Sequence, residues 1–165
     1  MLIKTAEHSF LSPLNGSVID IGCYGWEFTR AAIEHGAERV FAFDLGDCGQ
    51  PPAGVSFYRM AITGHTEFCS FTAESKRTAW HLGNGPDLVC CATLRKFMGW
   101  VGVNAIELLK LDCEGSELEI LRDIPEGINQ ISVEFHLHLW PDDEPLVDAA
   151  VRALSNRYRV IQHEK

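Results

Sequence analysis

Residues 108–121, LLKLDCEGSELEIL, join an apolar run to a cluster of ionisable side chains. The run predicts a buried strand, and the apolar spacing after Gly115 predicts an amphipathic helix. Between the two lie Lys110, Asp112, Glu114 and Glu117. Carboxylates at the C-terminal end of a strand are typical of open α/β sheets, which bind ligands where strands give way to helices. A plainer interpretation stays open, because carboxylates in a first helical turn also stabilise the helix through its dipole.

Strand and helix patterns alternate along the rest of the chain. Strands are predicted at residues 17–22, 39–44, 55–62, 66–71, 88–91, 106–111, 131–139 and 158–162. Helices are predicted at residues 26–35, 93–100 and 143–154, and after the strand at 106–111 as far as residue 123. The alternation predicts an α/β fold with a single Rossmann-like, doubly wound, mostly parallel sheet and helices on both faces.

Three segments stand apart from this alternation. Residues 1–16 form a lead-in that ends at the turn signal PLNG. Residues 45–54 contain three glycines and two prolines, which predict a loop where a second helix would be expected. Residues 72–86 are polar and irregular, and we interpret them as a mobile loop over the site.

Composition limits the class of protein and of partner. The 165 residues, 46% of them hydrophobic, fit one domain covering 1–165 with a sizeable core. A formal net charge of -9 argues against nucleic acid or an anionic membrane as the main partner, because both bind clustered Lys and Arg. No apolar stretch approaches the roughly 20 residues of a membrane span, and the chain does not start with a signal-peptide pattern.

The six cysteines carry information about the redox environment. None of them forms a Cys-x-x-Cys pair, so the spacing suits neither a zinc knuckle nor a disulfide framework. We therefore expect free, mostly buried thiols and a cytoplasmic location.

Residues 20–25, DIGCYG, follow the first strand of the main pattern and open a helix. Open α/β sheets bind nucleotide-like ligands at this position, and backbone N–H groups at the helix start receive a carboxylate or phosphate. Asp44 ends the next strand, near the spacing at which a carboxylate meets ribose hydroxyls. The dinucleotide and P-loop glycine patterns are both absent, so NAD and ATP fit poorly. A strand–loop–helix unit without any ligand remains the alternative.

Residues 110–121 follow the pattern Lys-x-Asp-x-Glu-Gly-x-Glu-x-x-x-Leu, which resembles the core motif of the FkbM family of S-adenosylmethionine-dependent methyltransferases. Further segments are similar to that family at residues 20–22 (DIG), 41–44 (FAFD), 90–94 (CCATL) and 133–136 (VEFH). Together they span about residues 17–138. The chain departs from the family pattern at Tyr24, Trp26, Leu45 and Arg95, which stand where the family usually has Asn, Gly, Pro and an acid. Trp26 would crowd the cofactor unless Gly25 takes over the turn.

The resemblance implies a class I methyltransferase-like fold with S-adenosylmethionine as cofactor. The DIG loop would surround the methionine portion, and Asp44 would bind the ribose. The cofactor-binding residues that we predict are Asp20, Gly22, Cys23, Tyr24, Gly25, Asp44, Asp112 and Glu114.

Methyl transfer to oxygen is an in-line displacement that needs aligned reactants and a group to take the acceptor's proton. Asp112 and His136 are the candidates for the base or the acceptor orienter. Glu134 would hold His136 or bind the acceptor hydroxyl, and Lys110 would pair with a carboxylate. A structural His136 is the plainer interpretation. A divalent metal held by Asp112, Glu134 and His136 is a second alternative, but no tight ligand spacing supports it, so we predict no metal site.

We therefore expect an enzyme that methylates a hydroxyl on a small molecule such as a sugar, lipid or polyketide-like compound, without nucleic acid or a membrane span. The closing antiparallel hairpin of the fold is short, which leaves open a homo-oligomer whose partner subunit completes the site. One rival is a non-catalytic binding module with a degenerate cofactor loop. A third interpretation is a different nucleotide-using α/β enzyme.

Overall fold

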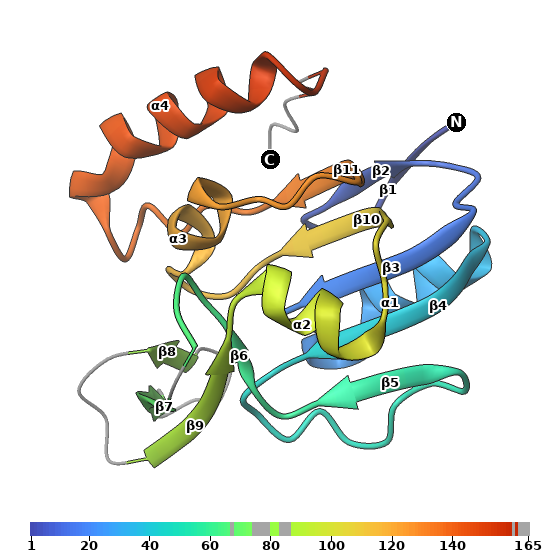
Figure 1. Cartoon of the computed structure of the whole chain (residues 1–165), viewed down its shortest axis with the longest axis horizontal. Coiled ribbons are helices and arrows are strands. Elements are labelled where there is room, and N and C mark those ends of the chain that lie inside the picture. Colours follow the sequence, from blue (N-terminus) through green and yellow to red (C-terminus); the bar gives the residue numbers. More distant parts are fainter. Residues whose placement is uncertain (67, 74–79, 83–86, 160, 162–165) are drawn as a thin grey trace.

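A computed structural model describes residues 1–66, 68–73, 80–82, 87–159 and 161. Its centre is a five-stranded parallel sheet of order β11–β10–β3–β4–β5 (Figure 1). The strands are β3 (Gly16–Ile21), β4 (Ala37–Phe43), β5 (Val55–Tyr58), β10 (Ile106–Leu111) and β11 (Ile128–Val133). The apolar run that begins the core stretch is β10, which pairs with β3 on one side and β11 on the other. The predicted α/β fold is thereby confirmed.

Helices cover both faces of this sheet. Figure 1 shows α1 (Glu27–Glu34) on the face opposite to α2 (Leu94–Val101). Successive residues of a strand point to opposite faces, so Leu108 packs with α1 while Leu109 packs with α2 and α3 (Glu117–Arg122). Burial on both sides explains why these strands are continuous apolar runs rather than alternating ones.

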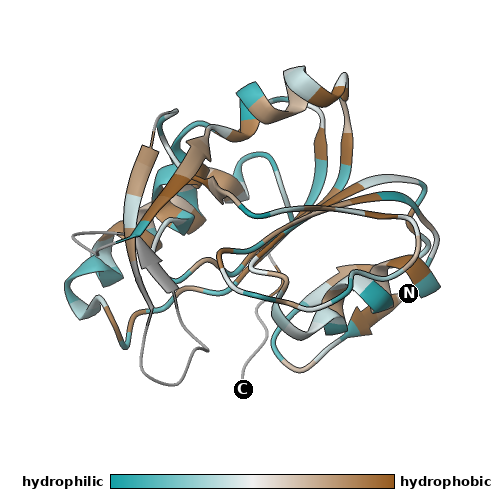
Figure 2. Cartoon of the chain, turned by 90° about the horizontal axis from the view of Figure 1, so that it is seen from below, coloured by the Kyte–Doolittle hydropathy of each residue, from teal (hydrophilic) through white to brown (hydrophobic). Residues whose placement is uncertain are grey.

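A second, four-stranded sheet of order β6–β9–β7–β8 corrects the prediction of a single sheet. Its strands are β6 (Ala61–Ile62), β7 (Phe68–Ala73), β8 (Trp80–Leu82) and β9 (Asp87–Ala92). The predicted strand at 55–62 breaks between β5 and β6, where the Nε of Arg59 donates to the carbonyl of Leu45 at 2.9 Å. Figure 2 shows that hydrophobic segments follow the strands of both sheets.

Some predictions about the small sheet and its loop have clear outcomes. The short extra strand predicted at 66–71 is found as β7, and the loop predicted at 45–54 contains no helix or strand. Most of the mobile loop predicted at 72–86, residues 74–79 and 83–86, lies outside the described residues. Its described parts, residues 72–73 and 80–82, belong to β7 and β8, so the loop prediction is wrong there. The strand predicted at 88–91 exists as β9, but it belongs to the small sheet.

Cys69 on β7 and Cys91 on β9 form a disulfide between neighbouring strands. The prediction that all the cysteines are free is therefore wrong for this pair. Their separation of 22 residues gives no sign of contact, because the pairing of β7 with β9 alone brings them together. The four free cysteines are Cys23, Cys48, Cys90 and Cys113.

The lead-in contains a hairpin that the sequence did not predict, formed by β1 (Leu2–Lys4) and β2 (Ser9–Leu11). The side chain of Gln130 on β11 links this hairpin to the main sheet. Its Oε1 accepts from the Leu11 backbone N–H at 2.7 Å, and its Nε2 donates to the Leu11 carbonyl at 3.1 Å. Strands of three residues are too short for a periodic pattern to be detected.

The C-terminal part differs from the prediction in two places. The strand predicted at 131–139 ends at Val133, because β10 ends at Leu111, the residue that pairs with Val133. The chain then turns, and the Leu139 N–H donates to the carbonyl of His136 at 2.9 Å. Residues 158, 159 and 161 are not in a strand, so the predicted last strand is wrong there; residues 160 and 162 lie outside the described part.

The last helix is confirmed. It is α4 (Glu144–Ser155), and Ala150 and Leu154 on it pack against the main core beside α3. Among the described residues, no helix combines the length and the apolar character that crossing a membrane requires.

Candidate functional site

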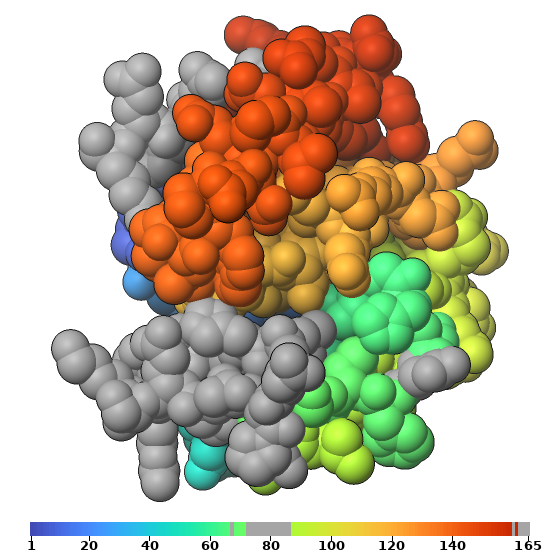
Figure 3. Space-filling view, turned by 90° about the vertical axis from the view of Figure 1, so that its left-hand side faces the viewer, coloured from blue at the N-terminus to red at the C-terminus, as the bar shows by residue number. Residues whose placement is uncertain are grey.

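A cleft opens at the carboxyl ends of β3, β4 and β10, the edge at which parallel α/β sheets bind ligands. Figure 3 views the molecule from the side toward which these strands run, where residues of the β10–α3 turn (gold) lie beside residues near 60 (green). The lining side chains come from the ends of these three strands and from β6: Ile21, Gly22, Tyr24, Phe43, Asp44, Leu45, Met60, Ala61, Ile62, Asp112, Cys113, Glu114 and Ser116.

Gly22 joins the first loop to the core stretch. Its φ is +79°, and a Cβ at this position would collide with the carbonyl oxygen of Asp112. Backbone hydrogen bonds complete the junction: Gly22 donates to the carbonyl of Phe43 at 2.8 Å, and Asp112 donates to that of Ile21 at 3.1 Å. The two most informative motifs of the sequence therefore touch directly, and only glycine allows this close approach.

Lys110 lies beneath the cleft with its side chain 3% exposed. Its Nζ is 3.3 Å from Asp20 Oδ1 and 3.1 Å from Asp112 Oδ2, and it donates to the carbonyl of Gly22. Burial alone would lower the pKa of Lys110, but the carboxylates of Asp20 and Asp112 outweigh it and raise the pKa above its ordinary value. Lys110 therefore stays charged and fixes the carboxylates rather than exchanging protons.

Asp20 does not line the cleft. Its side chain is fully buried, and its Oδ2 accepts a hydrogen bond from the hydroxyl of Thr29 at 2.5 Å. The Asp20 carboxylate therefore lies under the DIG loop and links Thr29 on α1 to Lys110 on β10.

His136 sits among three carboxylates of the core stretch. Its Nε2 is 3.4 Å from Asp112 Oδ1 and 3.5 Å from Glu114 Oε1, and its Nδ1 is 3.1 Å from Glu117 Oε1. Burial opposes the charged ring, but Asp112, Glu117 and Glu114 together raise the pKa of His136 to about 10. The ring is therefore an imidazolium at neutral pH, and both of its nitrogens donate.

The pKa values of Asp112 and Glu117 shift in the opposite direction, downward. Burial alone would raise the pKa of Asp112, but hydrogen bonds from His136 and His8 and the charge of Lys110 lower it well below its ordinary value. The pKa of Glu117 is also lowered, because hydrogen bonds from His136 and from the backbone N–H groups of Glu117 itself and Cys113 outweigh burial. Both side chains are ionised throughout the neutral range.

His8 is a site residue that the sequence did not reveal. Its Nε2 lies 3.4 Å from Asp112 Oδ2, and its Nδ1 lies 3.0 Å from the hydroxyl of Ser132. A carboxylate has no hydrogen to donate, so His8 donates through Nε2 and its other nitrogen faces the Ser132 hydroxyl. Nothing in the irregular lead-in distinguishes His8 from a surface histidine, because only the β1–β2 hairpin brings it to the site.

The other predicted residues fall into two groups, those that line the cleft and those that do not. Gly22, Tyr24, Asp44, Asp112 and Glu114 line the cleft. Asp44 is nearly buried and its Oδ1 accepts from the Gly46 N–H at 2.8 Å; burial raises its pKa above the ordinary value.

Cys23, Gly25 and Glu134 do not line the cleft. Cys23 is buried under the first loop, and Gly25 has a φ of +78° in its turn. Glu134, which the sequence predicts either to hold His136 or to bind the acceptor hydroxyl, has its carboxylate within 4.8 Å of ligand atoms of His8 and Asp112.

Trp26 does not crowd the cleft. It adopts a left-handed conformation with φ 64°, next to Gly25, and its side chain is only 3% exposed. The indole packs edge-on against Phe57, and its Nε1 donates to the carbonyl of Cys48 at 2.6 Å. The ring is therefore directed into a core cluster behind the loop, and it braces the segment that follows Asp44.

The ligand set of the metal alternative is not brought together. Asp112, Glu134 and His136 do not form one ligand set among the described residues; two sets share Asp112 instead, one with Glu114 and His136 and one with His8 and Glu134. Lys110 and the His136 imidazolium already neutralise the oxygens of Asp112 that a metal would need.

Comparison with known proteins identifies the family. The model of the Methyltransferase FkbM domain matches residues 29–160, most of the chain, and includes the core stretch and the carboxylate that ends β4. No curated protein and no solved structure gives a significant match. The matched range starts after the DIG loop, so the assignment of that loop depends on its contact with Asp112. The chain belongs to the FkbM methyltransferase family.

Proposed function

We propose that this protein is an S-adenosylmethionine-dependent methyltransferase that methylates a hydroxyl group of a small molecule such as a sugar, a lipid or a polyketide-like compound. The observation that carries the proposal is the contact of Gly22 with Asp112. It places the DIG loop, the carboxylates of the core stretch and Asp44 around one cleft, the arrangement that a nucleoside-linked donor requires.

The residues present fit this cofactor. Asp44, directly after β4, has a carboxylate that can accept from two ribose hydroxyls, and Gly22 leaves the backbone accessible where a side chain would intrude. Tyr24 is 57% exposed at the rim, where a flat ring can pack against a base. Glu114 supplies negative charge at the cleft that attracts a cationic sulfonium. When bound, the cofactor supplies an electrophilic methyl group.

Asp112 is the residue that we assign to the acceptor hydroxyl. Its side chain is 20% exposed and lines the cleft. A carboxylate with a lowered pKa is a weak base, but the proton of an attacking hydroxyl becomes strongly acidic as its oxygen forms the new bond, so a weak base suffices. A positioned base of this kind contributes about 10²–10⁴-fold to the rate.

His136 is assigned as a positioning residue. As an imidazolium it cannot accept a proton, but its contact with Asp112 Oδ1 fixes that carboxylate on one side. Lys110 and His8 hold Oδ2 on the other side. A carboxylate has about four lone-pair sites, so these contacts leave capacity for the acceptor hydroxyl while they lock its orientation.

The rest of the cleft indicates a small acceptor. Leu45, Met60, Ala61 and Ile62 provide an apolar part of the cleft lining. Apolar walls with a few directed polar groups are typical of small-molecule sites. The net charge of -9 disfavours a nucleic-acid acceptor.

The rival proposal is a binding module that has lost the cofactor. Its support is the bulky residues at positions 24 and 26 of the first loop. The Trp26 side chain packs away from the cleft, and Tyr24 lines it from an exposed position. We therefore favour the enzyme.

Isothermal titration calorimetry with S-adenosylmethionine tests the donor site. Wild type should bind with micromolar affinity, and Asp44→Ala should lose about tenfold or more. Asp47→Ala, a change to an exposed carboxylate three residues further along, is the matched control and should bind like wild type. Absence of binding to folded wild-type protein would overturn the proposal.

Transfer from methyl-labelled cofactor to a panel of hydroxyl compounds tests the acceptor site. Asp112→Asn should retain cofactor binding but lose about 10²-fold or more in turnover. If Asp112→Asn turns over like wild type, the base assignment is wrong.

A further inference from the structure

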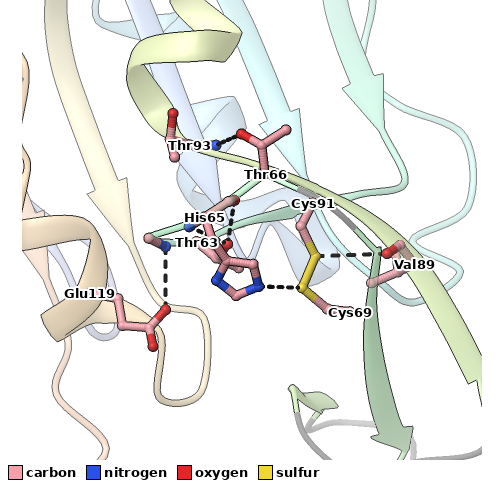
Figure 4. Close-up of a disulfide and its surroundings, with 9 residues drawn as sticks. Thr63, His65, Thr66, Cys69, Val89, Cys91, Thr93 and Glu119 are labelled. Atoms are coloured by element: carbon pink, nitrogen blue, oxygen red, sulfur yellow. Dashed lines mark hydrogen bonds between the residues drawn. A yellow bond between two sulfur atoms is a disulfide. The ribbon is translucent and has the colours of Figure 1, made fainter.

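A second cluster of reactive side chains lies in the small sheet, outside the cleft. Figure 4 shows His65, from the turn after β6, with its ring directed at the sulfurs of Cys69 and Cys91. His65 Nε2 is 3.2 Å from Cys69 Sγ, and the three potential ligand atoms all lie within 4.8 Å of one another. We propose that, when Cys69 and Cys91 are reduced, His65, Cys69 and Cys91 together bind a zinc ion.

The chemistry of the donor set favours zinc. Two thiolates and one imidazole are ligands that zinc prefers, and three protein ligands with a water in the fourth position form a recognised zinc geometry. In a tetrahedral site, Zn–S distances of about 2.3 Å and Zn–N distances of about 2.0 Å place the two sulfurs roughly 3.8 Å apart and each sulfur roughly 3.5 Å from the nitrogen. Cα atoms 6.2 Å apart, as in Cys69 and Cys91, allow their sulfurs either to bond or to share one ion.

The turn that carries His65 is held in place before any ion binds. The hydroxyl of Thr63 donates to the His65 carbonyl at 2.9 Å and accepts from the His65 N–H at 3.2 Å. The Thr63 N–H donates to the carbonyl of Ala92, next to Cys91, at 3.0 Å. The hydroxyl of Thr66 accepts from the Thr93 N–H at 3.4 Å (Figure 4). Preorganised ligands of this kind bind metal more tightly.

The accessibility of the three side chains also suits an ion site. Cys69 and Cys91 are buried, whereas His65 is exposed, so an ion and its water can enter past the ring. The two thiols lie in an apolar cluster with Leu45, Ala61 and Phe71, which excludes competing oxygen ligands from the inner side.

The disulfide and the zinc form are alternative states of one cross-link. A dithiol reductant gives two electrons and two protons to the Cys69–Cys91 bond and becomes a disulfide itself. Zinc then displaces both thiol protons, which leave to solvent, and no further electrons move. In either state β7 and β9 are joined beside β6, where Cys91 pairs with Ala61, a residue of the cleft wall. The small sheet therefore keeps a covalent or coordinate link under oxidising and reducing conditions.

Cobalt spectroscopy on the full chain tests the site. Protein reduced with a phosphine and given one equivalent of Co²⁺ should show thiolate-to-cobalt charge transfer with the intense visible bands of a tetrahedral ion. His65→Ala and Cys69→Ser should each weaken Co²⁺ and Zn²⁺ binding about tenfold or more. Oxidised wild type should show no charge-transfer band, because a disulfide sulfur is not a thiolate.

Matched controls separate this site from the others. Cys90→Ser changes the exposed neighbour of Cys91, and Cys48→Ser disrupts a second close set of thiols and a carboxylate, which comprises Cys23, Asp44 and Cys48. Both variants should keep the bands. Zinc should also raise the melting temperature of reduced wild type but not of His65→Ala, whose exposed side chain is dispensable for folding. Absence of the bands in reduced wild type, or their persistence in His65→Ala and Cys69→Ser, would overturn the proposal.

Discussion

Lys110 and Asp20 are register partners on β10 and β3, with Lys110 Nζ 3.3 Å from Asp20 Oδ1 and both side chains almost completely buried. A buried ion pair adds little net stability compared with an apolar pair, but removing one partner leaves an uncompensated charge. This pair lies directly below Gly22 and Asp112. Together with the hydrogen bonds from His136 and His8, the charge of Lys110 lowers the pKa of Asp112.

The first prediction concerns this pair. Lys110→Met should destabilise the protein by about 3–5 kcal/mol, because Asp20 and Asp112 lose their shared cation. Adding Asp20→Asn should recover part of the loss, so the two changes should be non-additive in a double-mutant cycle measured by urea unfolding. Lys96→Met, on the exposed side of α2, should change stability by no more than about 0.5 kcal/mol. A Lys110→Met protein as stable as the Lys96→Met control would show that Lys110 is not needed to stabilise the buried carboxylates of Asp20 and Asp112.

The second prediction concerns the junction of the two motifs. Gly22→Ala should destabilise the protein by at least about 2 kcal/mol and abolish cofactor binding, because the new Cβ meets the Asp112 carbonyl and the φ of +79° is unfavourable. Gly54→Ala is a matched control, with φ +82° and nothing within 4 Å of its Cβ. Gly54→Ala should lower the free energy of unfolding by only about 1–2 kcal/mol and leave cofactor binding intact. Equal effects of the two changes on unfolding and calorimetry would argue against the steric explanation.

The third prediction concerns His8. His8→Ala removes a contact to Asp112 and the edge-on packing of the ring against Phe28, so it should cost about 2–4 kcal/mol in thermal or urea unfolding. Turnover should fall more than cofactor affinity, because Asp112 loses one of its orienting partners. His8→Gln can still donate to a carboxylate and should recover part of the turnover. A His8→Ala enzyme with unchanged turnover would restrict His8 to a structural role.

Local sequence was enough to predict β3, β4 and β10 and the helices that follow β3 and β10, because the apolar runs and helix signals of these elements lie in consecutive residues. The cleft followed from the fold, since the carboxyl ends of neighbouring parallel strands meet at one edge. That is why the sequence alone groups Gly22, Asp44, Asp112 and Glu114 in one site, and all four line the cleft.

The remaining features depend on contacts that no local pattern records. The strand through Ile131 stops at Val133 because its neighbour ends, although its alternation continues to residue 139. His8 reaches Asp112 only through a hairpin of three-residue strands. The direction of the Trp26 side chain is set by its left-handed backbone and by the carbonyl of Cys48, neither of which is visible in the residue type.

The last prediction uses the pH dependence of His136. Its pKa is about 10 in the folded protein and about 6.5 in an unfolded chain, so the imidazolium stabilises the fold fully below pH 6.5. That contribution is lost progressively as the pH rises toward 10, at about 1.4 kcal/mol per unit, several kcal/mol in all. The lowered pKa values of Asp112 and Glu117 act in the opposite direction, and their contribution is lost as the pH falls below their ordinary range.

Urea unfolding of wild type and His136→Gln between pH 6 and 10 isolates the histidine from the other groups that titrate in this range. The stability difference between the two proteins should be largest near pH 6 and should shrink steadily toward pH 10, because only wild type has an imidazolium to lose. His138→Gln, at the neighbouring ring 5.7 Å away, is the matched control and should follow the wild-type curve. Parallel curves for wild type and His136→Gln would mean that Asp112, Glu114 and Glu117 do not hold a charged ring, and the positioning role proposed for His136 would fail with them.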